Sequence, residues 1–221
     1  SDLKPLNVEQ EKAILGEALA EWIKCGQVEL QIVEEATICN ISQAIRRFQP
    51  HVFHFVGHGQ FAADHNLIVL EDEANSALPV DECTFQQFFD GAHETRLVVL
   101  NACQTATLST SQPLAGLAPR LLQRQLSGVV AMQYPITDQA SLIFAREFYR
   151  SLAEGYPVDA AMAAARKGIL QELGAEQPEW GTPVLFLRAE NGQLFQAKAV
   201  ASSPYEVAIP VAPAKPVMFT M

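Results

Sequence analysis

Three short runs of almost uninterrupted apolar residues constrain the fold of this chain more than any other feature of its sequence. They are residues 51–57 (HVFHFVG), 96–100 (RLVVL) and 127–132 (SGVVAM). A strand that is buried on both faces of a parallel sheet is apolar throughout, whereas a strand with one wet face alternates apolar and polar residues. Stretches with helical spacing separate the runs. The sequence therefore predicts an α/β fold, a three-layer α/β/α domain around a mostly parallel central sheet.

The rest of the pattern predicts further elements. Asn7 and Gln10 are close to a capping box, which begins a helix that Gly26 ends. Further helices are expected at residues 40–48, 84–89, 114–126, 138–154 and 157–173, and further strands at residues 28–33 (VELQIV), 66–70 and 182–188. Residues 199–221 carry prolines among small residues, which is typical of a linker or tail.

Composition excludes several classes of protein. The formal net charge of −10 argues against nucleic acid as a partner. No apolar run approaches the roughly 20 residues that span a bilayer, and the first residues lack the apolar core of a signal peptide. The four cysteines form no CxxC pair, which favours a reducing compartment, and we expect a cytoplasmic protein.

Candidate catalytic groups follow two of the predicted strands, where parallel sheets place functional side chains. His58 follows residues 51–57, and Cys103 follows residues 96–100. A thiolate nucleophile beside an imidazole is the arrangement of a Cys–His hydrolase, and the backbone amides of Gly59 and Cys103 could hold an oxyanion. Spacing alone leaves two other interpretations open, a buried apolar cysteine and an ordinary loop histidine.

Two further residues are candidates for substrate binding. Gln133 follows the strand expected at 127–132, and Asp138 begins the next helix. Asp138 has two interpretations, a helix cap or an acidic wall that selects a basic P1 side chain. His51, His54 and His58 have a spacing that would suit a metal site on a helix, but they fall in a predicted strand. We therefore expect His54 to be a core residue, and neither a metal nor another cofactor is expected.

Two segments resemble the signature blocks of a known family. Residues 54–59 (HFVGHG) and 98–105 (VVLNACQT) are similar to those of the CHAT domain, a caspase-like cysteine peptidase domain of the caspase–gingipain–separase clan. Further similar blocks follow in the family's order, at residues 116–122, 128–138, 148–152, 160–166 and 178–183. The resemblance covers about residues 1–195, and several ordered blocks make it specific.

The resemblance implies a caspase-like fold and a cysteine endopeptidase. His58 would be the base or proton donor and Cys103 the nucleophile, and the substrate would be an extended protein or peptide segment. The alternative is a non-catalytic caspase-like interaction or signalling module. The domain is expected at residues 1–198, without the strand that usually precedes the family's first helix, because residues 1–6 are too short and polar to form it. Other domains of a longer regulatory parent chain, of the bacterial signalling type, are the expected partners.

Overall fold

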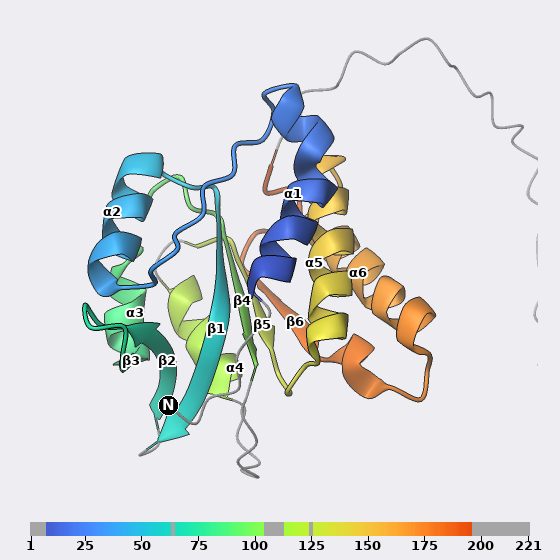
Figure 1. Ribbon diagram of the computed structural model, residues 1–221. Helices are drawn as coiled ribbons and strands as arrows, with labels where there is room; N and C mark the ends of the chain where they lie inside the picture. The colour runs from blue at the N-terminus through green and yellow to red at the C-terminus, as the bar shows by residue number, and fades with distance from the viewer. Residues whose placement is uncertain (1–7, 63–64, 104–112, 124–125, 196–221) are drawn as a thin grey trace, which may run out of the picture.

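The computed structural model describes residues 8–62, 65–103, 113–123 and 126–195 (Figure 1). For residues 60–62, 65, 66, 103 and 113–116 it describes the backbone only. The strands are β1 (Val52–Ala62), β2 (His65–Glu71), β3 (Ala77–Asp81), β4 (Leu97–Cys103), β5 (Gly128–Met132) and β6 (Pro183–Leu187). The helices are α1 (Val8–Lys24), α2 (Ile38–Phe48), α3 (Glu82–Gln87), α4 (Pro113–Leu122), α5 (Asp138–Ala153) and α6 (Val158–Leu173), with a short 3₁₀ helix, η1 (Pro178–Gly181).

The described strands form one sheet in the order β3-β2-β1-β4-β5-β6. The central strands β1, β4 and β5 are parallel neighbours, whereas β2, β3 and β6 each pair antiparallel with the strand beside them. Strands β1, β3, β4 and β5 consequently run in one direction, and β2 and β6 run against them. The predicted parallel centre of the sheet is confirmed, whereas the other three of the five pairings between the described strands, at the margins, are antiparallel.

Helices cover both faces of the sheet, so the predicted α/β/α layering is confirmed (Figure 1). On one face, helices α2, α3 and α4 pack against the sheet, with Phe85 and Leu121 beside Leu100 in one buried cluster. On the other face, helices α1, α5 and α6 pack in a second cluster, with Phe148 beside Val99. Neighbouring residues of β4 face opposite clusters, which explains why this strand is apolar at every position from 97 to 100.

The strand expected at residues 28–33 is wrong. This segment is an irregular connection between α1 and α2, and its Leu30 and Ile32 are 38% and 43% exposed. Its apolar and polar residues alternate as they do in a strand, but a strand needs a partner edge. The segment pairs with none of the described strands, although residues 52–57 of β1 have β4 as their only strand partner.

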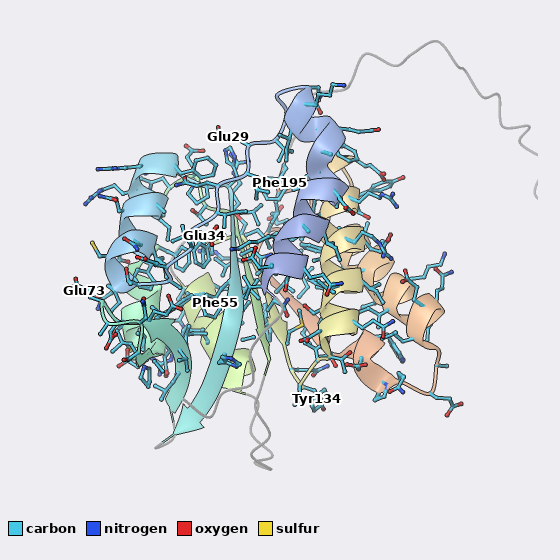
Figure 2. The ribbon with its side chains drawn as sticks, viewed as in Figure 1. Glu29, Glu34, Phe55, Glu73, Tyr134 and Phe195 are labelled. Atoms are coloured by element: carbon cyan, nitrogen blue, oxygen red, sulfur yellow. The ribbon has the colours of Figure 1, made fainter. Side chains whose placement is uncertain are left out.

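Strand β1 is longer than expected. The apolar run at residues 51–57 predicted a strand that ends at residue 57, but β1 continues to Ala62 because β2 returns alongside it as an antiparallel partner. Gly57 is required for packing rather than for a turn. A Cβ atom there would lie 2.2 Å from Cζ of Phe55, whose buried ring packs toward α3. Figure 2 shows Phe55 on this side of β1.

We predict that Gly57→Ala lowers the free energy of unfolding by about 1–3 kcal/mol, because the buried Phe55 ring has to move to admit the methyl group. Gly16→Ala is the control. Gly16 lies in α1, and a Cβ atom added to it would have no other atom within 4 Å, so alanine should stabilise the helix by up to about 1 kcal/mol. Urea unfolding of both variants measures the difference, and a shift in the same direction for both would contradict the packing argument.

Candidate functional site

The structure places the backbones of His58 and Cys103 directly opposite each other. They are the last Cα partners in the parallel pairing of β1 with β4. Neighbouring strands lie about 4.8 Å apart. Both residues were expected on loops just past their strands. Instead His58 lies inside β1 and Cys103 is the last residue of β4. Strand β1 therefore runs on beyond the end of β4, paired there with β2 alone.

His58 is half-buried at this position. Its Nδ1 atom is buried and has no hydrogen-bond partner among the residues whose side chains are described. In many Cys–His and Ser–His sites a carboxylate or amide holds this nitrogen and fixes the tautomer of the ring. The described part of the structure supplies no such group to His58.

The other predicted site residues lie at different places along the sheet. Gly59 is inside β1, opposite Ile68 of β2, rather than in a loop. The Gln133 side chain donates a hydrogen bond to the Gly181 carbonyl at 2.7 Å. This bond ties the segment after β5 to η1, and Figure 2 shows the neighbouring Tyr134 at the same end of β5.

Asp138 is not the cap of its helix. The N-cap of α5 is Thr137, whose hydroxyl oxygen accepts a hydrogen bond from the Ala140 amide at 3.3 Å. Asp138 occupies the first turn, where the partial positive charge of the helix N-terminus favours a carboxylate. Its charge also reaches Glu11 of α1, where it contributes to raising the pKa of that carboxyl group.

A buried polar cluster that the sequence analysis did not identify lies on the α1 and α5 face of the sheet. Asn101 of β4 donates hydrogen bonds from Nδ2 to Oε1 of Glu11 at 2.7 Å and to Oγ of Ser141 at 2.5 Å. Ser141 donates in turn to Oε2 of Glu11 at 3.4 Å. Glu11, Asn101 and Ser141 are only 5%, 3% and 4% exposed. Three elements, α1, β4 and α5, thus share one buried carboxyl group.

His54 lies beside this cluster, as the core residue that the sequence predicts. Its ring stacks on Tyr149 with centroids 5.5 Å apart, and its Nε2 atom is 3.5 Å from Oε1 of Glu11. The contact would be an ion pair only if His54 were protonated and Glu11 ionised. Burial lowers the pKa of His54 to about 4 and raises the pKa of Glu11, so burial opposes both charges. At neutral pH we therefore treat His54 as a neutral ring next to a carboxyl group that Asn101 and Ser141 stabilise.

Comparison with protein families now identifies the chain. The family model of the CHAT domain matches residues 2–199. The chain belongs to the CHAT domain family. CHAT domains have a caspase-like fold and are related to cysteine peptidases. A search of curated proteins found no match to this CHAT domain.

Two classes of feature are absent from the part of this CHAT domain that the structure describes. None of its described helices is long and apolar enough to cross a membrane. Within the same residues, no three histidine, cysteine, aspartate or glutamate side chains gather in a way that could hold a metal ion. The described cysteines Cys25, Cys39 and Cys83 are free and exposed.

The low pKa of His54 predicts an acid-sensitive fold. Between pH 6.5 and about 4 the unfolded chain binds a proton at His54 and the folded chain does not, so the free energy of unfolding falls as the pH falls. The fall should reach about 3 kcal/mol at 1.36 kcal/mol per pH unit. Glu11 acts in the opposite direction, because its raised pKa lets the folded chain bind a proton at higher pH.

His54→Phe keeps a ring on Tyr149 and removes the titrating group. Urea unfolding between pH 4 and 7.5 should show a smaller loss of stability on acidification for this variant than for the wild type. His51→Asn is the control, because His51 lies exposed just before the same strand. An acid profile of His54→Phe that matches the wild type would show that His54 is not the group responsible.

Proposed function

We propose that this CHAT domain is a cysteine endopeptidase in which Cys103 is the nucleophile and His58 is the acid–base group. The observation that carries the proposal is the pairing of these two residues as opposite neighbours on parallel strands. Such a dyad needs its thiol and imidazole within reach of each other. Because the chain belongs to a family related to cysteine peptidases, we interpret the paired Cys103 and His58 as a catalytic dyad.

The geometry suggests which face of the sheet holds the reaction. Directly opposite residues of paired strands direct their side chains to the same face. His54 lies four residues before His58 on β1, and it packs toward α1 and α5. The proposal therefore places the reaction on that same face, near the carboxyl end of β4, where the backbones of His58 and Cys103 pair.

The proposed reaction has two halves. The Cys103 thiolate attacks the peptide carbonyl carbon, and the C–N bond then breaks as His58 transfers a proton to the leaving amine. A thioester between Cys103 and the acyl part of the substrate remains. His58 next removes a proton from water, whose oxygen attacks the thioester carbonyl, so that the carboxylic acid and the Cys103 thiolate are released and His58 is again protonated. The backbone amides of Gly59 and Cys103 are the proposed donors to the oxyanion in both halves.

The substrate in this proposal is an extended segment of a protein. Gln133 and Asp138 are the candidates for contacting it, because both follow β5, the parallel neighbour of β4. The Gln133 side chain is already bonded to Gly181, so Asp138 is the stronger candidate of the two. We further propose that the domain works in a reducing compartment, the cytoplasm, within a longer regulatory protein.

Cys103→Ala should abolish peptide hydrolysis while it changes the free energy of unfolding by about 1 kcal/mol or less, because a thiol contributes little core volume. The measurement is a cleavage profile of a peptide library with wild type and variant. Cys83→Ala, which removes an exposed thiol, is the control and should cleave like the wild type. Turnover that survives in Cys103→Ala would rule out this nucleophile.

A labelling experiment separates the enzyme from the non-catalytic module. A peptide acyloxymethyl ketone should alkylate Cys103 selectively in the wild type, and His58→Ala should lose this selectivity because the imidazole no longer favours the thiolate. Mass spectrometry identifies the labelled cysteine. Equal labelling of Cys103 and the exposed Cys25, Cys39 and Cys83 in the wild type would favour an interaction module.

Asp138 provides a test of specificity. A desolvated Arg or Lys at P1 would gain a charge-assisted hydrogen bond of roughly 1.5–3 kcal/mol from its carboxylate, which equals about 10- to 150-fold in relative rate. The expected result is that Asp138→Asn lowers the ratio of cleavage of P1-Arg to P1-Leu peptides. Because Thr137 caps the helix, the substitution should leave the α5 N-terminus folded. An unchanged ratio would remove Asp138 from the substrate site.

A further inference from the structure

The end of β4 is held by the sheet on one side only. Strand β4 pairs with β5 as far as Leu100, which lies opposite Ala131. Residues 101–103 pair with β1 alone, and the next residue of β5, Met132, pairs with Pro183 of β6. The three residues that lead to Cys103 therefore lack the ladder of hydrogen bonds that fixes the rest of β4 between two neighbours.

The Asn101 side chain anchors this end of β4 through hydrogen bonds. Its Nδ2 atom donates to Glu11 of α1 at 2.7 Å and to Ser141 of α5 at 2.5 Å. Both contacts are buried, and the Ser141 hydroxyl also reaches the Glu11 carboxyl group. The side chain thus fastens the strand end to the two helices that cover this face of the sheet.

The hydrogen bonds from Asn101 to Glu11 and Ser141 resist a movement of Asn101, because breaking them costs free energy. If Asn101 moved away, the Glu11 carboxyl group would stay buried with one hydrogen-bond donor fewer, and an unsatisfied buried polar group opposes such a movement. Asn101 stands only two positions before Cys103, which is about 6.6 Å along a strand. A shift of Asn101 would therefore carry Cys103 with it.

We infer that Asn101, held by Glu11 and Ser141, is a positioning residue that sets the end of β4 so that the Cys103 thiol meets His58. The inference rests on the proposed dyad and adds to it a role for α1 and α5. Asn101 itself touches neither substrate nor reacting atoms in this account. It acts through the backbone of β4.

A merely structural role for Asn101 would lower stability without changing the reactivity of Cys103. Thr95→Val is a matched control for that possibility. The Thr95 hydroxyl is buried, with the residue 4% exposed, and donates to the Pro50 carbonyl at 2.7 Å. Thr95 lies just before β4, at the opposite end of the strand from Cys103. Its replacement removes a buried hydrogen bond far from the proposed dyad.

The experiment uses the full chain with Cys25, Cys39 and Cys83 replaced by serine, so that iodoacetamide reports on Cys103 alone. The alkylation rate is measured from pH 5 to 10 for Asn101→Leu, Ser141→Ala, Thr95→Val and the unsubstituted background. The midpoint of this profile gives the pKa of the thiol, which a neighbouring imidazolium lowers. kcat and KM for a cleaved peptide and the thermal midpoint are measured on the same proteins.

Asn101→Leu should raise the midpoint of the alkylation profile and lower kcat by about tenfold or more, with KM within about twofold, since a small displacement of a reacting group is enough for such a loss. Ser141→Ala keeps the Glu11 contact and should show a smaller change in the same direction. Thr95→Val should lower the thermal midpoint and leave the alkylation profile and kcat within about twofold of the background.

The inference is overturned if Asn101→Leu and Ser141→Ala alkylate like the background, or if Thr95→Val shifts the profile as much as they do. Should Asn101→Leu fail to fold, Ser141→Ala decides the outcome. Failure of the proposed function has a different signature. No peptide of the library would then be cleaved by the wild type, while the alkylation profiles still show whether Asn101 sets the environment of Cys103.

Discussion

The burial of β4 on both faces is the constraint on which the rest of the molecule depends. Residues 97–100 are fully buried, each 0% exposed, and they alternate between the two apolar clusters. Burying a Val or Leu side chain contributes about 1.5–3 kcal/mol to the free energy of unfolding. Because its side chains enter both clusters, this one strand links the helical layers on the two faces of the sheet. It also fixes the position of β4 beside β1, and with it the pairing of Cys103 with His58.

The sequence predicts the central strands well because burial on both faces leaves a simple apolar signature. The sequence predicts strands less well where their formation depends on which neighbouring strand is available for pairing. Residues 28–33 have a strand-like alternation but pair with none of the described strands, whereas β3 was not predicted because it is short and contains Pro79. Strand β6 was expected at residues 182–188 without a direction, and its antiparallel pairing with β5 follows from the path of the chain rather than from composition.

The candidate site shows the same division. His58 and Cys103 stand out because they follow apolar runs, but the hydrogen-bonding of Asn101 could not be predicted from a motif in which it is one polar residue among several. One signal was present, since Glu11 lies at helical spacing from Ile14 and Ala18 on the apolar side of α1. A carboxylate on such a stripe needs a buried partner. Which strand supplies that partner depends on how α1 packs on the sheet, and this packing cannot be predicted from a single sequence.

The two outer strands of the sheet have a consequence for how copies of the protein meet one another. An edge strand offers unpaired amide and carbonyl groups that can template pairing with another chain. Strand β3 carries Pro79 within it, and β6 begins with Pro183. Proline has no amide hydrogen, so it interrupts the row of donors at an edge. Each described edge is also short, at five residues, and the sheet is thereby protected against edge-to-edge aggregation.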